Sequence, residues 1–194
     1  MGRIVLASQS PRRRELLEQM GIARFDIIPA RGEEQMDRPL EPGKLVECLA
    51  LAKARETALQ VEQSALGIAA DTVVVLEGRV LGKPADEAEA FDMLSALSGR
   101  THQVYTGVAL MQGGRTKSAS ECTDVTFRPL TEGEIRGYIA AGESMDKAGA
   151  YGIQGRGALL VEGIRGDYFN VVGLPVCRLG KMLKKFGVDT LEAP

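Results

Sequence analysis

Residues 68–76 read Ile-Ala-Ala-Asp-Thr-Val-Val-Val-Leu, a nearly continuous apolar stretch. Such a run is typical of a central strand that is buried on both faces of a sheet. The pair Glu77-Gly78 then turns the chain into Val80 and Leu81, which predicts a tight hairpin. We therefore expect a sheet in the core of this protein, with residues 68–76 as its middle strand.

Predicted strands and helices alternate on both sides of this stretch. The predicted strands are residues 3–7, 25–28, 68–76, 80–81, 104–111, 121–127, 157–162 and 168–172. The predicted helices are residues 11–20, 42–61, 86–97, a short one after the capping box at 131–134, and 175–186. Because tight turns join some neighbouring strands, the sheet cannot be purely parallel. The sequence thus predicts an α/β fold, with a mixed, twisted sheet flanked by helices.

Two of the helices have clear local signals. Ser10 is expected at the N-cap of the first, followed by Pro11 at its first position, and Gly21 ends it. The second begins at Pro42. Its predicted apolar face is Leu45, Val46, Leu49 and Ala52.

The composition is that of an ordinary globular protein. The 194 residues are 44% hydrophobic and 26% charged, with a net charge of −2. This length predicts a single domain over residues 1–194. The charge provides no general attraction to nucleic acid or to an anionic membrane, and no apolar run approaches the roughly 18 residues of a membrane span. The three cysteines are expected to be reduced, mostly buried thiols in a cytoplasmic protein.

The single histidine excludes several kinds of site. A His-rich zinc site and paired-histidine chemistry both need more than His102. His102 lies at the start of a strand-like run, just before the predicted strand at 104–111, and no Gly-x-Ser-x-Gly motif supplies a nucleophile for it, so we expect a structural or surface histidine. Acid–base chemistry then depends on carboxylates, lysine, tyrosine or metal-bound water.

A basic segment lies where the first predicted strand gives way to a helix. It reads Ser8-Gln9-Ser10-Pro11-Arg12-Arg13-Arg14. Free N–H groups and the positive end of the helix dipole make a helix N-terminus a site for anions, whereas three arginines there oppose the dipole. A bound phosphate would remove this conflict. The alternative is a solvated basic turn.

Charged residues elsewhere suggest a second part of a site. Asp71 lies within the most apolar strand, where a carboxylate must be paired, hydrogen-bonded or metal-bound. This setting is typical of a functional acid, although a structural ion pair would look the same. From spacing alone, Lys53 and Lys83 are expected to be ordinary surface residues, and Glu33-Glu34 are weak indicators of a metal site.

The last segment is Asp146-Lys147-Ala148-Gly149-Ala150-Tyr151-Gly152-Ile153-Gln154-Gly155. Its glycines allow the backbone to approach a ligand closely, and its polar residues supply binding groups; a tight structural loop is the alternative. It does not match a dinucleotide-binding fingerprint. Together, these segments predict a cleft that holds a phosphorylated ligand and a divalent metal.

The same segments resemble the Maf family of nucleotide pyrophosphatases. The matching stretches keep the family's order and cover nearly the whole chain: 6–13, 70–72, 82–84, 97–99, 146–155 and 171–175. The resemblance implies hydrolysis of a nucleoside triphosphate between its α- and β-phosphates, which yields the monophosphate and pyrophosphate. It also implies an ITPase-like fold with two lobes around a central cleft, a divalent metal (Mg²⁺ or Mn²⁺), a cytoplasmic location and a homodimer. Stable binding to nucleic acid or to a membrane is not expected.

The resemblance also assigns roles to individual residues. Asp71 is the implied general base toward water. The implied phosphate-binding residues are Ser10, Arg13, Lys53 and Lys83. The implied metal ligands are Glu34 and Asp71, and the residues that line the cleft are Asp146 and Lys147.

The substrate base is implied by three further residues. Arg12, Thr72 and Gln154 match the members that resemble dTTP/UTP pyrophosphatases, and a glutamine amide suits the imide edge of uracil or thymine. Two positions depart from the family: Gly32 replaces a bulkier or acidic residue, and Ser144 replaces a common proline.

Two alternatives remain at this point. One is a pyrophosphatase for a different or modified nucleotide. The other is a nucleotide-binding regulator of cell division without turnover, to which an intact Asp71 would be of little use.

Overall fold

The computed structural model describes residues 2–30 and 40–191. The chain divides into two compact units, each made of several segments. Unit 1 comprises Met1–Asp71, Thr106–Glu121 and Gly173–Pro194, and unit 2 comprises Thr72–Tyr105 and Cys122–Val172. The single domain expected over residues 1–194 stays a prediction, and each unit is described by itself.

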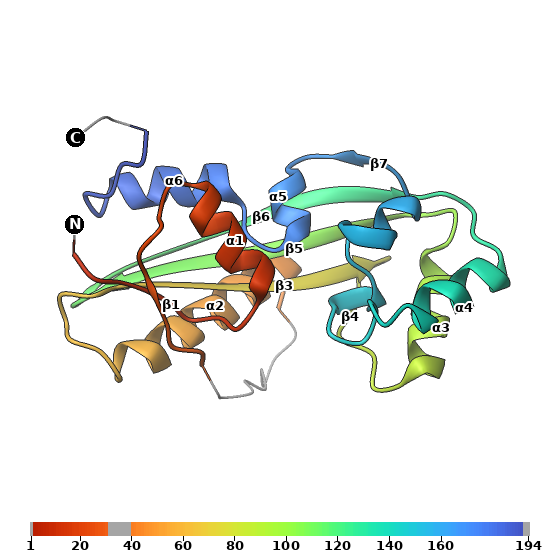
Figure 1. The fold of residues 1–194 in the computed structure, drawn as a ribbon, viewed down its shortest axis with the longest axis horizontal. Coiled ribbons are helices and arrows are strands. Elements are labelled where there is room, and N and C mark those ends of the chain that lie inside the picture. Colours follow the sequence, from red (N-terminus) through yellow and green to blue (C-terminus); the bar gives the residue numbers. More distant parts are fainter. Residues whose placement is uncertain (1, 31–39, 192–194) are drawn as a thin grey trace. The chain divides into compact units, whose positions relative to one another are not determined.

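The described residues form one mixed sheet, as predicted. Its strands are β1 (Ile4–Leu6), β2 (Asp26–Ile27), β3 (Leu66–Leu76), β4 (Arg79–Leu81), β5 (Thr101–Gln112), β6 (Arg115–Phe127) and β7 (Val161–Arg165). The order is β2-β1-β3-β5-β6-β7, with β4 paired to β3 (Figure 1). β1 runs parallel to both β2 and β3, whereas β4 is antiparallel to β3 and β7 is antiparallel to β6. The apolar stretch that predicted a central strand is β3, and Val5 of β1 pairs with its Gly67.

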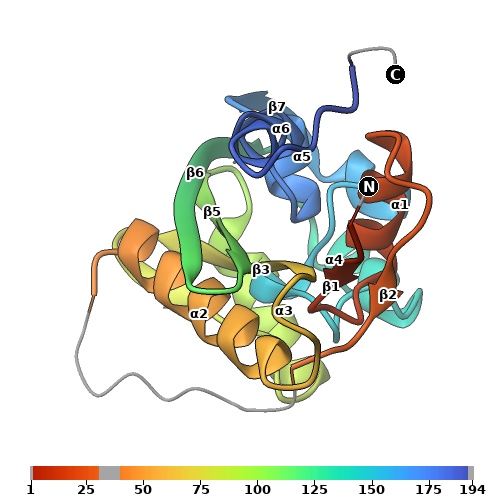
Figure 2. The same ribbon diagram turned by 90° about the vertical axis from the view of Figure 1, so that its left-hand side faces the viewer.

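The described part of unit 1 contains the helices α1 (Pro11–Gln19), α2 (Pro42–Ala58) and α6 (Val176–Lys184). Figure 2 shows α2 on one face of the sheet strands of this unit, and α1 and α6 on the other. α1 has Ser10 at its N-cap and is followed by Gly21 at φ +84°, as predicted. α6 buries Leu179, Met182 and Leu183.

The predicted apolar face of α2 is partly wrong. The buried residues are Val46, Ala50, Ala54 and Thr57, whereas Leu45, Leu49 and Ala52 are only partly buried. The reason is a close approach to β5: a Cβ on Gly107 would lie 2.1 Å from the Val46 carbonyl oxygen. A helix this near a strand can place only small side chains against it.

Unit 2 has its own core beneath α3 (Glu87–Leu97) and α4 (Glu132–Ala140), which pack side by side (Figure 1). Apolar side chains from both helices meet residues of β3, β5 and β6. Both helices begin as their sequences predict. Asp86 accepts a hydrogen bond from the Glu89 N–H at 2.8 Å, and Thr131 and Glu134 form the capping box.

Near the C-terminus, the strand predicted at 157–162 is only partly confirmed, and the strand predicted at 168–172 is wrong. Residues 155–159 form a 3₁₀ helix, η2 (Gly155–Leu159), after which β7 begins at Val161. Residues 168–172 form helix α5 (Tyr168–Val172). The Asp167 carboxylate accepts from the Phe169 N–H at 2.8 Å at the start of this helix, and the Asn170 amide donates to the Val104 carbonyl at 2.9 Å. A five-residue, mostly apolar stretch does not distinguish a strand from a helix, and these contacts decide it.

The cysteines differ in part from expectation. All three are free, but Cys48 is only partly buried, and Cys122 and Cys177 are exposed. Over residues 2–30 and 40–191, none of the helices has the length and apolar character that crossing a membrane requires.

Candidate active site

The basic segment of unit 1 is organised by Ser8. β1 ends at Leu6 and α1 begins at Pro11, and the side chain of Ser10 makes no capping hydrogen bond. The buried Ser8 hydroxyl instead accepts from the Ser10 N–H at 3.3 Å and from Arg13 Nη1 at 3.1 Å. Ser8 therefore joins the start of the helix to its arginine, a role that its hydroxyl at a strand end could have indicated.

Arg13 is folded back into unit 1. Its Nε donates to the Gly173 carbonyl at 2.8 Å. Burial lowers the pKa of the Arg13 guanidinium, the negative charge of Asp71 opposes this effect, and the positive charge of Arg12 adds to it. An arginine keeps its charge at neutral pH despite such a shift. Two cations and one carboxylate therefore lie close enough to influence one another.

Asp71 forms an ion pair with Lys53. β3 holds Asp71 directly after the fully buried Ala70, and the Asp71 side chain is 17% exposed. Lys53, on α2, donates through Nζ to Asp71 Oδ1. The spacing-based expectation that Lys53 is an ordinary surface residue is wrong. Its place beside the buried Ala54 on α2 is the signal that could have found it, because a lysine next to a buried face extends along that face.

In unit 2, the segment at 146–155 is held by several hydrogen bonds. Lys147 Nζ donates to Asp146 Oδ1 at 2.6 Å and to the Glu143 carbonyl at 2.6 Å. Glu143 also accepts from the Arg156 N–H, with Oε2 at 3.2 Å. Glu143 thus ties the two ends of the segment together, although no motif in the sequence pointed to it.

The same segment is connected to the loop that carries Lys83. The Gly149 N–H donates to the Gly82 carbonyl at 2.9 Å, and Lys83 is exposed. Gly149 has φ +66°, and a Cβ there would lie 3.0 Å from the Val74 side chain. Only glycine combines this conformation with this contact. Two of the motifs that the sequence analysis singled out are therefore neighbours in space.

The predicted site residues thus fall into two groups. In unit 1, the structure brings together Arg12, Arg13, Lys53 and Asp71, with Ser10 at the start of the same helix. In unit 2, it brings the loop of Lys83 to the segment that contains Asp146, Lys147 and Gln154. Thr72 is partly buried and Gln154 is exposed. Gly32, Glu33 and Glu34 lie outside the described residues.

The carboxylate chemistry fits a hard divalent cation. Within the described ranges, no cluster of three or more His, Cys, Asp or Glu side chains forms a metal site. Mg²⁺, however, is commonly held by one or two carboxylates together with substrate phosphates. Asp71 offers such a carboxylate in a partly exposed position.

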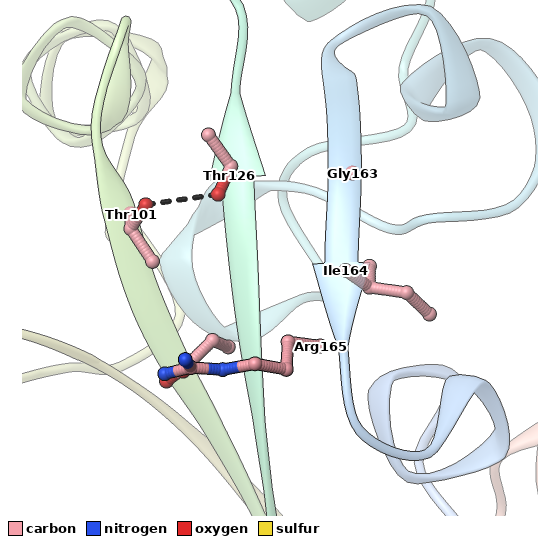
Figure 3. Close-up of a pocket in the computed structure, with 6 residues that line it drawn as sticks. Thr101, Thr126, Gly163, Ile164 and Arg165 are labelled. Atoms are coloured by element: carbon pink, nitrogen blue, oxygen red, sulfur yellow. Dashed lines mark hydrogen bonds and ion pairs between the residues drawn. The ribbon is translucent and has the colours of Figure 1, made fainter.

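A shallow depression lies elsewhere in unit 2, over β5, β6 and β7 (Figure 3). It is lined by Thr101, Asp124, Thr126, Gly163, Ile164 and Arg165. The Thr101 and Thr126 hydroxyls are 2.8 Å apart, and Arg165 forms an ion pair with Asp124 at 2.5 Å. Its polar groups already have partners, and none of the predicted site residues lines it.

Known proteins resemble this chain over its whole length. A family profile described as "Maf-like protein" matches residues 3–186. A dTTP/UTP pyrophosphatase of Moorella thermoacetica is 58% identical over 191 residues, which covers 97% of each chain. A dTTP/UTP pyrophosphatase of Bacillus cereus is 50% identical and covers 100% of both chains.

Among solved structures, a HAM1 protein from Coxiella burnetii matches in fold. Its TM-score is 0.54 at 19% sequence identity, and the match covers 95% of this chain and 100% of that one. The full-length matches confirm the family that the motifs indicated. The chain belongs to the family of Maf-like proteins.

Proposed function

We propose that this chain is a nucleoside triphosphate pyrophosphatase that hydrolyses dTTP and UTP to the monophosphate and pyrophosphate. The observation that carries the proposal is the grouping of Asp71 with Lys53 and Arg13 in unit 1. A carboxylate beside fixed cations suits the hydrolysis of a polyphosphate, because the cations neutralise the phosphates while the carboxylate orients water. The names of the relatives at 58% and 50% identity support the same reaction.

In this proposal, Asp71 is the general base toward the attacking water. Its carboxylate is oriented by the Lys53 ammonium, and it remains 17% exposed, so that water can reach it. Lys53 then both orients Asp71 and binds a phosphate, because its ammonium group carries three hydrogen-bond donors.

The phosphates are bound by Ser10, Arg13, Lys53 and Lys83. Ser10 supports this role because its hydroxyl does not cap α1, although it lies at a helix N-terminus. Arg13 supports it because Ser8 and Gly173 hold its guanidinium in one direction. Asp146 and Lys147 line the nucleotide site.

The base is selected by Arg12, Thr72 and Gln154. A glutamine amide offers a donor and an acceptor together, which match the carbonyl and N–H groups of uracil and thymine. Gln154 is exposed, as a residue that contacts a ligand must be.

A divalent metal, Mg²⁺ or Mn²⁺, completes the proposed site. Asp71 and Glu34 would hold it, and it would supply charge neutralisation on the phosphates and a more acidic bound water. The homodimer and the cytoplasmic location that the family resemblance implies belong to this proposal too. Size-exclusion chromatography with light scattering tests the dimer.

The decisive experiment is release of pyrophosphate and monophosphate from a panel of canonical and modified nucleoside triphosphates. It is run with Mg²⁺, with Mn²⁺ and with chelator. We expect fast, metal-dependent conversion of dTTP and UTP, with CTP and the purine nucleotides slow.

The other outcomes separate the alternatives. Preference for a modified or different nucleotide would retain the reaction and reject the roles of Arg12, Thr72 and Gln154. Absence of pyrophosphate from every nucleotide would reject the enzyme and leave a nucleotide-binding regulator.

A further inference from the structure

The proposed mechanism makes no use of a buried aromatic cluster in unit 2. The rings of His102, Phe127 and Tyr151 meet edge to face. The centroid distances are 5.0 Å from His102 to Phe127, 5.4 Å from His102 to Tyr151 and 4.6 Å from Phe127 to Tyr151. His102 is fully buried and Tyr151 is 5% exposed. Such edge-to-face packing does not require the polar atoms of either ring.

Within the cluster, His102 Nε2 and the Tyr151 hydroxyl form a hydrogen bond of 2.7 Å. The other ring nitrogen of His102, Nδ1, has no hydrogen-bond partner among the described residues. Burial lowers the pKa of His102 to about 4 and raises the pKa of the Tyr151 phenol, so both groups are neutral at pH 7. Two phenylalanines would fill this space without a desolvated nitrogen, so packing alone does not explain the pair.

The hydrogen bond anchors the segment that contains Gln154. Tyr151 has an extended backbone, with φ −143° and ψ 160°. Tyr151 and Ile153 are buried and Gln154 is exposed, so the anchored Tyr151 restrains the short stretch of backbone that presents Gln154.

The residue before Tyr151 is strained. Ala150 has φ +60°, in the left-handed region that non-glycine residues rarely adopt. It is fully buried and follows Gly149, which is also left-handed. A strained turn persists only when its surroundings hold it, and strain of this kind gathers at ligand-binding segments. The Tyr151 hydroxyl bond is one such restraint, and the bond from the Gly152 N–H to the Tyr138 hydroxyl, 3.2 Å, is another.

We propose that His102 is a positioning residue, which acts through Tyr151 to aim Gln154 at the substrate base. This inference rests on the proposed function, because it assigns a second layer of residues to base selection. His102 itself does not contact the nucleotide.

The test compares Tyr151→Phe, which removes one oxygen atom, with His102→Phe and the double variant. The matched control is Tyr168→Phe, the same change on an exposed tyrosine of the same unit, whose ring meets Phe169 edge to face. For each protein, kcat and KM are measured with dTTP, UTP and CTP, and thermal unfolding is recorded.

We expect Tyr151→Phe to lower kcat/KM for dTTP about tenfold, as the loss of one oriented hydrogen bond predicts, mainly through KM. The preference for dTTP over CTP should narrow. The double variant should be no worse than either single variant, because both remove the same bond. Tyr168→Phe should behave like the wild type.

If Tyr151→Phe has an unchanged KM and an unchanged base preference, the inference is overturned. The proposed function still holds in that case, provided that the wild type turns over dTTP and UTP. A wild type that releases no pyrophosphate would overturn both. If His102→Phe fails to fold, Tyr151→Phe decides alone, since it leaves a ring of the same shape in place.

Discussion

Asp71 shows how one residue can be at once costly for folding and useful for chemistry. It is a carboxylate in a strand that is mostly buried, and its neighbour Ala70 is fully buried. The Lys53 ammonium offsets the cost by pairing with one carboxylate oxygen. Because both side chains retain some exposure, the pair contributes little to stability and leaves the carboxylate accessible.

Asp71→Asn tests the role of this carboxylate. The variant keeps the shape of the side chain and removes the base, so we expect turnover to fall by about 10²–10⁴-fold while dTTP binding is largely retained. Pyrophosphate release measures turnover, calorimetry measures dTTP binding, and circular dichroism checks that the fold is retained. Asp92→Asn, a change of an exposed carboxylate on α3, is the control and should be fully active. Substantial hydrolysis by Asp71→Asn would move the base elsewhere, with Glu34 as the next candidate.

Ser144 offers a test at a position where the chain departs from its family. It is fully buried, and its hydroxyl has no hydrogen-bond partner among residues 2–30 and 40–191. We expect Ser144→Ala to raise the free energy of unfolding by about 1 kcal/mol, because it removes a desolvated polar group.

The matched control for Ser144 is Ser98→Ala. The Ser98 hydroxyl accepts from the Leu130 N–H at 2.7 Å, so this variant should lower the free energy of unfolding by about 1 kcal/mol. Urea titration measures both. A loss of stability in Ser144→Ala would show that the hydroxyl has a role in the folded protein.

At the scale of elements, the backbones of α2 and β5 come close together at Gly107. A Cβ on Gly107 would lie 2.1 Å from the Val46 carbonyl oxygen and 2.7 Å from the Glu47 nitrogen. Both are backbone atoms, which cannot rotate away. This contact holds α2 close to the sheet, and α2 carries Lys53 to Asp71.

Gly107→Ala should therefore be one of the more damaging changes of a single methyl group. We expect it to lower the free energy of unfolding by at least about 3 kcal/mol, at the upper end of the usual cost of overpacking. Gly137→Ala, in α4, is the comparison: nothing lies within 4 Å of its added Cβ, and it should stabilise the protein slightly. Equal stability of the two variants would contradict the close approach of α2.

At the scale of the whole molecule, one buried side chain shapes the response to acid. His102 is the only histidine of the chain. Burial alone lowers its pKa from 6.5 to about 4, and the groups that face it, Phe127 and the neutral Tyr151, supply no charge. The unfolded chain therefore binds a proton between these two pH values that the folded chain does not.

The sign follows from this difference in bound protons. The contribution of the buried, neutral His102 to the free energy of unfolding is fully present above pH 6.5. It is lost as the pH falls toward 4, by about 3 kcal/mol in total. Urea titrations between pH 7 and 4.5 measure this slope in the wild type and in His102→Phe. Carboxylates titrate similarly in both proteins, so their effect cancels in the difference. Identical slopes would show that His102 is not protected from protonation.

Much of this fold can be predicted from short, local sequence patterns. The apolar run that became β3, the turn at Glu77-Gly78, Ser10 and Pro11 at the start of α1, and the capping box of α4 all involve residues a few positions apart. Local backbone preferences and hydrogen bonds decide such features, so they can be predicted without the rest of the molecule. The motifs of the candidate site are also short stretches of sequence, so they and the family that they indicate could be identified from the sequence.

Other features depend on contacts between distant residues. The stretch at 168–172, apolar except for Asn170, forms helix α5 and not a strand because Asn170 reaches the Val104 carbonyl of β5. The buried face of α2 consists of small side chains because Gly107 of β5 lies against it.

In the candidate site, Lys53 was expected to be an ordinary surface lysine but pairs with Asp71. In the aromatic cluster, His102 forms a hydrogen bond with Tyr151, which lies 49 residues later. Neither pairing leaves a periodic signal in the sequence. The sequence by itself determined which elements and which chemical groups this protein has. Only the tertiary structure decided which of them meet, because such pairings depend on packing between segments that are far apart along the chain.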